Sequence, residues 1–255
     1  MNPNLQKRKG ESKPVVWGPP PEDLHLPDGQ VHVWRLNLDL LSASIADLWM
    51  VLSEDEQQRA NRYRFERDRR WFVARRGRLR HILGKYLDSD PASLRFSNNR
   101  YGKPALYTEA HRWLSFNTSH SQGLALLACA RKVDIGVDLE YRRENINYLD
   151  LAKRFFSIKE VAALRLLSMA SLSEAFFLCW TRKEAFIKAS GEGLSLPLDA
   201  FDVSVMPGEP ARLLGTRQGL EPPDKWSLFN LEPAPEYSAA LAVHGRGYEL
   251  QCWVD

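Results

Sequence analysis

Hydrophobic and polar positions alternate in several segments of the first half of the chain. Alternation over residues 31–38 predicts a strand, and the apolar run at 123–130 predicts a buried one. Ser53 followed by Glu56 forms a capping box, which predicts the start of a helix. The pattern therefore predicts, in order, a strand at 31–38, helices at 53–64 and 68–86, extended segments at 94–97 and 115–117, and a strand at 123–130.

The second half repeats this order. Residues 134–141 predict a strand, and the segments 226–231 and 238–243 predict a closing hairpin. Between them, two capping boxes predict the starts of two helices, at Ser157/Glu160 and at Ser171/Glu174.

Strand, helices and strands therefore occur twice, which predicts an α+β fold. We expect a pseudo-twofold pair of similar α+β subdomains, at residues 29–134 and 135–255. No clear internal repeat of the sequence supports this duplication, so it rests on the order of the elements. The polar, proline-rich residues 1–28 are expected to form an extended or flexible arm.

Three carboxylates and two lysines occur in two short stretches of the second half. Asp138 and Glu140 are two apart in an expected strand, so their side chains share one face. Glu184 and Lys188 are four apart in an expected helix, so they share one stripe, from which Lys183 points away. Carboxylates without a nearby cysteine favour Mg²⁺ over zinc. Lysines beside them suggest a substrate that carries phosphate groups.

The same residues also fit less specific interpretations. An Asp-x-Glu pair is common at solvated strand edges, and Lys-Glu-x-x-x-Lys is a common pattern of surface ion pairs on helices. The apolar residues that flank both stretches favour a functional site, because charges beside a core are more often functional. A magnesium nuclease, or another phosphoryl transferase or phosphodiesterase, could use the same acids. A non-catalytic carrier-binding protein is a further alternative, but it would have no reason to keep three converging carboxylates and Lys188.

Amino-acid composition further limits the classes of protein to which the chain can belong. Lys and Arg total 35 against 32 for Asp and Glu, and this net charge of +3 is too small to predict nucleic-acid binding. The three cysteines lie in apolar contexts without metal-type spacing, which predicts a reduced, cytoplasmic protein. No apolar run reaches eighteen residues and the N-terminus lacks a signal core, so no membrane association is expected.

Four ordered motifs then show a family resemblance over about residues 50 to 205. The stretches Gly136-Val-Asp-Leu-Glu140 and Trp180-x-x-Lys-Glu-Ala-x-x-Lys188 resemble the signature pair of the 4′-phosphopantetheinyl transferases of the surfactin-synthetase-activating type. Tyr101-Gly-Lys-Pro104 and Phe116-Asn-Thr-Ser-His-Ser121 resemble two further elements of that family. The resemblance implies a two-subdomain fold with the active site in the cleft between the halves.

The resemblance also implies a reaction. The enzyme would transfer the phosphopantetheine arm of coenzyme A to a serine of an apo carrier protein and release adenosine 3′,5′-bisphosphate. Asp138, Glu140 and Glu184 would bind Mg²⁺, and Glu184 would accept the serine proton, directly or through a water. Lys188 would stabilise the charge of the leaving phosphate, with Lys183 at a phosphate edge.

Other residues match the positions at which this family binds coenzyme A. Lys103 and His120, with Ser119 beside them, would lie near the 3′-phosphate; a serine hydrolase is a poor alternative because no G-x-S-x-G motif is present. Arg59 and Arg62 would provide basic phosphate contacts. Glu56 is acidic where the family would place a lysine, so the substitutes proposed are Arg75 and Arg76.

The expected partners follow from this reaction. They are coenzyme A and apo acyl, peptidyl or polyketide carrier proteins, with no nucleic acid or membrane, and the protein is expected to be a monomer. A surface that receives an acidic carrier should be basic with exposed apolar groups. Lys153-Arg-Phe-Phe156 has that composition, although packing of at least one phenylalanine into the core is the more ordinary interpretation.

Overall fold

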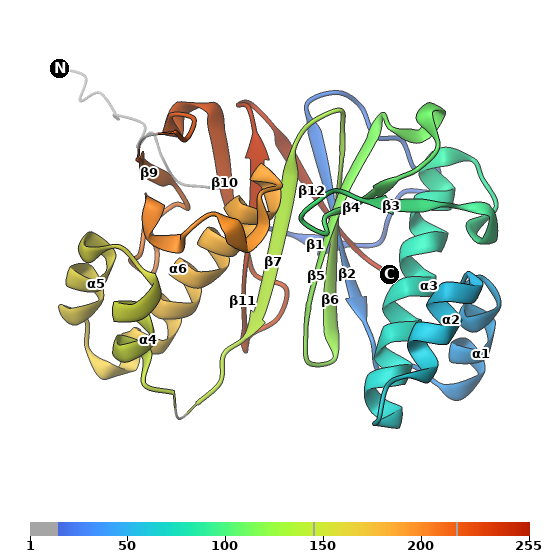
Figure 1. Cartoon of the computed structure of the whole chain (residues 1–255), viewed down its shortest axis with the longest axis horizontal. Helices are drawn as coiled ribbons and strands as arrows, with labels where there is room; N and C mark the ends of the chain where they lie inside the picture. The colour runs from blue at the N-terminus through green and yellow to red at the C-terminus, as the bar shows by residue number, and fades with distance from the viewer. Residues whose placement is uncertain (1–14, 145, 218) are drawn as a thin grey trace, which may run out of the picture.

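The computed structural model describes residues 15–144, 146–217 and 219–255, so the first half of the expected arm lies outside the described residues. The chain forms a mixed α/β fold of two halves, with the helices on the outside and the strands between them (Figure 1). Among the described residues, no helix combines the length and the apolar composition needed to cross a membrane.

The first half places three helices against a five-stranded sheet. Its helices are α1 (Ser42–Met50), α2 (Glu54–Asn61) and α3 (Glu66–Leu87). Its sheet has the order β1-β12-β2-β6-β5. These strands are β1 (Trp17–Gly18), β2 (Gln30–Asn37), β5 (Leu114–Ser121), β6 (Leu124–Arg131) and β12 (Glu249–Val254). A small hairpin, β3 (Phe96–Asn98) and β4 (Pro104–Leu106), precedes β5.

The C-terminal strand, β12, pairs with strands on the other side of the subdomain boundary expected at residue 134. β12 pairs in parallel with β2, and β1 pairs in parallel with β12 at the sheet edge. The last strand of the chain therefore belongs to the sheet of the first half, which corrects the assignment of 135–255 to one unit. The expected arm also contributes a strand, because Trp17 donates its indole N–H to the carbonyl of Glu232 at 2.9 Å while its backbone extends the sheet.

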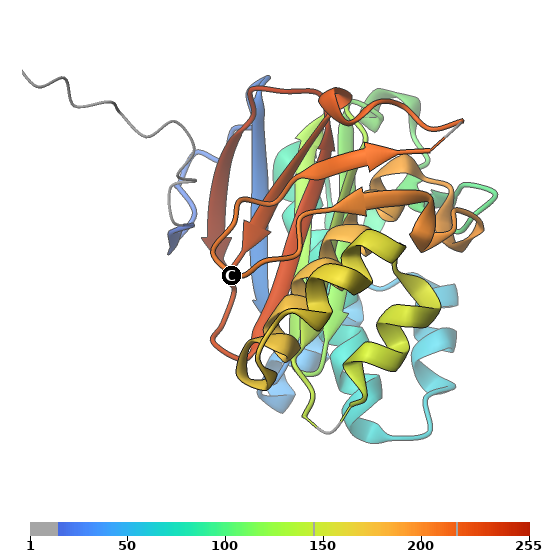
Figure 2. The ribbon, with the colours of Figure 1, turned by 90° about the vertical axis from the view of Figure 1, so that its left-hand side faces the viewer.

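The second half consists of a three-stranded sheet and three helices. The sheet has the order β10-β11-β7, and a separate two-stranded sheet pairs β8 with β9. The strands are β7 (Ile135–Tyr141), β8 (Phe201–Val203), β9 (Leu213–Thr216), β10 (Trp226–Leu231) and β11 (Tyr237–His244). The helices are α4 (Tyr148–Phe155), α5 (Ile158–Arg165) and α6 (Met169–Ser190). In Figure 2, which turns the molecule by 90° from the view of Figure 1, these helices lie in front of the sheet.

Three apolar cores hold these layers together. Each half has one core between its helices and its sheet. Trp34 is among the largest buried side chains in the core of the first half, and Phe186 is among those in the core of the second. The third joins the two sheets, because Val33 and Leu126 of the first pack with Val137 and Leu241 of the second. Burial of apolar surface between the sheets therefore keeps the two halves in contact.

The local sequence signals located most helix starts. Ser53 and Ser157 both cap their helices through the expected capping boxes. The box expected at Ser171 is wrong, because the N-cap of α6 is Ser168, three residues earlier. Helix α4 was not expected, and it packs the apolar groups of the 153–156 segment inward: Phe156 is buried, and Phe155 meets Trp180 edge to face.

Candidate active site

Strands β5 and β7 lie side by side where the two halves meet (Figure 1). Polar side chains of β5 bridge the two strands. Alternate residues of a strand share one face, so Asn117, Ser119 and Ser121 all point toward β7. Asn117 accepts the backbone N–H of Val137 at 2.9 Å, and Ser121 accepts that of Tyr141 at 3.0 Å. We call this line of contacts the β5–β7 seam.

Gly136 lets helix α6 approach β7 closely. A Cβ atom at this position would lie 2.2 Å from the carbonyl oxygen of Ala185 and 2.3 Å from the backbone nitrogen of Ala189. Real Cβ atoms do not approach backbone atoms so closely, so only glycine fits without moving the helix. The close approach brings the side chain of Lys188 to the seam.

Lys188 is bonded to both strands of the seam. Its ammonium donates to Asp138 Oδ1 at 2.6 Å and to Ser119 Oγ at 3.0 Å. Ser119 Oγ in turn donates to the same Asp138 oxygen at 3.0 Å. Ser119, which was expected beside Lys103 and His120, therefore lies with Asp138 and Lys188 instead; Asp138 is buried and Lys188 is partly accessible.

The other two carboxylates lie near this group. Burial, followed by the negative charge of Asp138, raises the pKa of both Glu140 and Glu184. Glu140 accepts a hydrogen bond from Ser121 Oγ at 3.1 Å, which lowers that pKa in part. Since the charge of Asp138 acts on both glutamates, and that of Glu140 acts on Glu184, the three acids lie in one electrostatic cluster.

This cluster fits a cation only in part. Asp138 Oδ2 is buried and has no hydrogen-bond partner among the described residues, so its lone pairs are unused there. Within the described residues, however, no three His, Cys, Asp or Glu side chains converge closely enough to hold a metal. Mg²⁺ is commonly bound through one or two carboxylates together with substrate phosphates, so two of these acids suffice for such a site.

A second group of candidate residues lines a cavity of about 380 Å³ beside the seam. Arg75, His120 and Glu140 all line it, together with Ser121 and Arg143. Arg75 Nε is buried without a partner among the described residues, and burial lowers the pKa of Arg75 to about 10. Partial burial, then the charges of Arg75 and Lys188, lower the pKa of His120 to about 4.

The other three candidate arginines, Arg59, Arg62 and Arg76, lie in different surroundings. The Arg59 guanidinium lies 5.4 Å from the ring of Phe72, and its charge affects Arg75, so it belongs beside this cavity. Arg62 is exposed and does not line the cavity. Arg76 instead forms an ion pair with Glu56, which also binds Arg80 at 2.7 Å.

The acidic residue at position 56 therefore has a structural role. It is buried, it completes the capping box of α2, and it pairs with two arginines of α3. Arg76 is accordingly engaged within the first half rather than directed to the seam.

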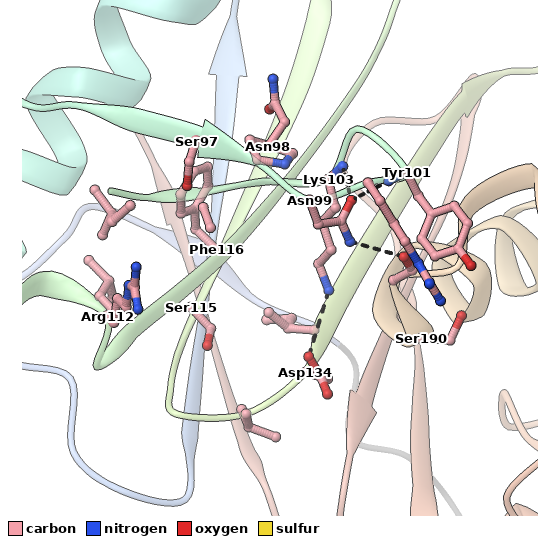
Figure 3. Close-up of a pocket in the computed structure, with 18 of the residues that line it drawn as sticks. Ser97, Asn98, Asn99, Tyr101, Lys103, Arg112, Ser115, Phe116, Asp134 and Ser190 are labelled. Carbon is pink, nitrogen blue, oxygen red and sulfur yellow. Dashed lines mark hydrogen bonds and ion pairs between the residues drawn. The ribbon is translucent and has the colours of Figure 1, made fainter. Parts of the chain in front are cut away.

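Lys103 does not lie with His120. It lines a separate cavity of about 600 Å³ with Asp134 and Ser115, near the start of β5 (Figure 3). His120 lies at the other end of β5. His120 is five residue steps along the strand from Ser115, which corresponds to roughly 16 Å. Lys103 Nζ donates to the carbonyl oxygen of Ala189 at 3.0 Å. The structure thus does not bring Lys103 and His120 to one common phosphate.

Lys183 lies outside the site as well. Its ammonium is fully buried and pairs with Glu160 of α5 at 2.8 Å. It also donates to the carbonyls of Leu198 and Phe201, both at 2.7 Å. All its donors are thereby used within the core of the second half, and the expected contact of Lys183 with a phosphate edge does not agree with this placement.

Three residues of the site were not identified from the sequence. Asn117 and Ser121 belong to the same strand face as Ser119, so the period of two could have indicated them. Arg143 is the second residue after β7. It lines the cavity beside Glu140, and its charge acts on Glu140.

Carboxylates, a lysine and an arginine-lined cavity thus lie together where the two halves meet, and such a set of charges suits a substrate that carries phosphate groups. Residues 134–242 match the 4′-phosphopantetheinyl transferase superfamily, and residues 41–132 match the family described as 4′-phosphopantetheinyl transferase, N-terminal.

Individual relatives agree. The 4′-phosphopantetheinyl transferase HetI of Nostoc sp. is 42% identical over 93% of this chain and 98% of its own length. The L-aminoadipate-semialdehyde dehydrogenase-phosphopantetheinyl transferase of Schizosaccharomyces pombe is 31% identical over 78% of this chain and 76% of its own. The 4′-phosphopantetheinyl transferase Sfp of Bacillus subtilis is 33% identical over 60% and 66%. The chain belongs to the 4′-phosphopantetheinyl transferase superfamily.

Proposed function

We propose that this enzyme transfers 4′-phosphopantetheine from coenzyme A to a serine hydroxyl of an apo carrier protein at the β5–β7 seam. The observation that carries the proposal is the position of Lys188, whose ammonium joins Ser119 to Asp138 beside two further carboxylates. Such a group can hold a pyrophosphate together with its counter-ion, which is the reacting part of coenzyme A.

The reaction breaks one P–O bond and forms another. The carrier serine oxygen attacks the β-phosphorus, and the bond from that phosphorus to the bridging oxygen breaks. The hydroxyl proton goes to a base, and adenosine 3′,5′-bisphosphate leaves with the negative charge. Glu184 is the proposed base, because its raised pKa makes it a better proton acceptor than an ordinary surface carboxylate.

Lys188 is the proposed electrostatic catalyst. A fixed cation stabilises the leaving phosphate more strongly as its charge develops, so Lys188 should act mainly on the transition state. Asp138 holds this ammonium in place at 2.6 Å. Two of the carboxylates Asp138, Glu140 and Glu184, together with the substrate phosphates, would also hold Mg²⁺, which when bound would neutralise part of the phosphate charge.

We also propose that the 3′-phosphate of coenzyme A binds in the cavity of Arg75 and His120. The unpartnered Nε of Arg75 supports this, because a buried guanidinium N–H without an acceptor is costly and a phosphate oxygen would supply one. Arg59 lies near enough to add positive charge. Arg62 remains a candidate only through its place in the sequence.

Dephospho-coenzyme A tests this assignment. Each lost charge-assisted hydrogen bond corresponds to roughly 1.5–3 kcal/mol, or about ten- to a hundredfold in affinity. Arg75→Met should raise the KM for coenzyme A but leave that for dephospho-coenzyme A unchanged. An equal rise for both would place Arg75 at the pyrophosphate or in the fold.

The carrier protein tests the function itself. The enzyme is incubated with coenzyme A, Mg²⁺ and an apo carrier, and the carrier is weighed by mass spectrometry. A phosphopantetheine added to one serine supports the transferase. An unmodified carrier with cleaved coenzyme A would indicate a phosphodiesterase, and an unmodified carrier retained by the enzyme would indicate a binding protein.

The cellular setting remains part of the proposal. We infer a cytoplasmic, monomeric enzyme that acts on fatty-acid, polyketide or nonribosomal-peptide carriers. The buried, unpaired state of Cys129, Cys179 and Cys252 supports a reducing compartment.

A further inference from the structure

The β3–β4 hairpin of the first half contacts the end of α6 in the second half. An α-helix leaves its last carbonyls without partners inside the helix. Two of the carbonyls at the end of α6 are satisfied by this hairpin: Lys103 Nζ donates to Ala189 O, and Asn99 Nδ2 donates to Gly191 O, both at 3.0 Å. Figure 3 shows the Asn99 contact beside the ammonium of Lys103. We call Asn99 and Lys103 the α6 clasp.

Asn99 uses both ends of its amide group. Its Oδ1 accepts the backbone N–H groups of Tyr101 and Lys103, both at 2.9 Å, and so fixes the tip of the hairpin. Gly102 has a φ of +87° in this tip, which favours glycine. The NH₂ group is thereby aimed at Gly191. One side chain therefore holds the hairpin in shape and attaches it to the helix.

The charge of Lys103 suits the position. The C-terminus of a helix carries partial negative charge, which a nearby ammonium stabilises. The Lys103 side chain is largely buried, and its only carboxylate neighbour among the described residues, Asp134, lies at the limiting distance of 4.0 Å. Its closest contact is thus the helix end itself.

The clasped end of α6 is also the end that carries Lys188. Lys188 directly precedes Ala189, and the helix backbone at these residues touches β7 at Gly136. Releasing Ala189 and Gly191 would free the last turn of α6, and the ammonium could no longer be held between Ser119 and Asp138. The hairpin comes from the other half of the molecule, so it couples the arrangement of the two halves to the site.

We propose that Asn99 and Lys103 are positioning residues, which cap α6 from the opposite half and so hold Lys188 at the seam. This inference rests on the proposed function of Lys188. It differs from the sequence expectation, in which Lys103 binds the 3′-phosphate.

Asn99→Asp is the sharpest test. The aspartate keeps an acceptor for the hairpin tip, but it loses the donor to Gly191 and places negative charge at the helix C-terminus. A displacement of about 1 Å of a catalytic group can cost on the order of a hundredfold in rate. We therefore expect kcat to fall roughly ten- to a hundredfold with an unchanged KM for coenzyme A.

Asn98→Asp is the matched control. Asn98 is the neighbouring residue, lines the same cavity, and makes no side-chain hydrogen bond among the described residues. It should keep the wild-type kcat. Equal losses in both variants would overturn the proposal, because a negative charge anywhere on the hairpin would then suffice.

A double-mutant cycle separates positioning from a general loss of stability. If Asn99 acts through Lys188, Asn99→Asp should add no further loss of kcat to Lys188→Ala. Multiplicative losses would overturn the proposal. Circular dichroism melting establishes that each variant is folded at the assay temperature. Should Asn99→Asp fail this check, the cycle is run with Lys103→Met instead.

The substrate analogue decides the role of Lys103. Under the proposal, Lys103→Met lowers kcat equally with coenzyme A and with dephospho-coenzyme A. A rise in KM confined to coenzyme A would overturn it and return Lys103 to the 3′-phosphate. The failure of the proposed function would be visible separately, since the wild-type enzyme would then not modify the carrier at all.

Discussion

Replacing Gly136 by alanine should damage the site through a single methyl group. The new Cβ would lie 2.2 Å from Ala185 O, whereas ordinary contacts begin at 3.4 Å, so the helix or the strand must move by about 1 Å. Both neighbours are backbone atoms of elements in the core, and neither can turn away as a side chain can. Overpacking of this kind typically costs about 1–3 kcal/mol of stability.

The catalytic consequence should be larger than the loss of stability suggests. Lys188 Nζ lies 2.6 Å from Asp138 Oδ1, and a shift of about 1 Å between α6 and β7 would break this hydrogen bond. A misplacement of that size can reduce the rate on the order of a hundredfold. We expect Gly136→Ala to fold, to melt at a lower temperature, and to transfer phosphopantetheine about a hundredfold more slowly.

The assay measures the mass of an apo carrier over time, beside thermal melting of the same preparations. Gly18→Ala serves as the control, because a Cβ at Gly18 would meet no atom within 4 Å. It should match the wild type in both measurements. A Gly136→Ala enzyme with wild-type melting and wild-type transfer would refute the idea that close packing of α6 on β7 sets the position of Lys188.

Two further changes test the fold around the site. Lys183→Met should destabilise the protein by about 3–5 kcal/mol in urea unfolding, because it leaves the buried Glu160 without its partner. The KM for coenzyme A should not change. A variant of wild-type stability with a raised KM would instead indicate that Lys183 binds a phosphate. Burial, with a smaller effect of His25, lowers the pKa of His32 to about 4, so the unfolded chain binds a proton there that the folded chain does not. Stability should therefore fall as the pH drops from about 6.5 to about 4, by up to about 3 kcal/mol from this group. His32→Gln should remove that part of the loss, and parallel pH curves for both proteins would contradict it.

Local patterns in the sequence were sufficient for much of the fold. The capping boxes at Ser53 and Ser157 act through neighbouring residues, so they are visible in a few letters. The alternation along β7 likewise gave the shared face of Asp138 and Glu140. Strand β12 could not be assigned in this way, because its partners β1 and β2 lie at the other end of the chain.

In the site too, features set by neighbouring residues could be predicted from the sequence, whereas contacts between distant segments could not. The spacing of Glu184 and Lys188 placed both on one stripe of α6, and Lys188 does reach Asp138. Lys183 points elsewhere because its partner, Glu160, comes from α5, and spacing within one helix cannot show that. Lys103 was expected beside His120 because both match positions at which the family binds coenzyme A, but they line two separate cavities at opposite ends of β5.

Transfer by wild-type enzyme and by Lys188→Ala, measured side by side on one apo carrier at saturating coenzyme A, tests the central claim most directly. The wild type should add one phosphopantetheine to one serine and release an equal amount of adenosine 3′,5′-bisphosphate. Lys188→Ala should bind coenzyme A with a similar KM but show a kcat lower by about a hundredfold or more, since its charge acts on the transition state. A variant with the wild-type kcat, or a wild-type enzyme that leaves the carrier unmodified, would contradict the assignment of the β5–β7 seam as the site of transfer.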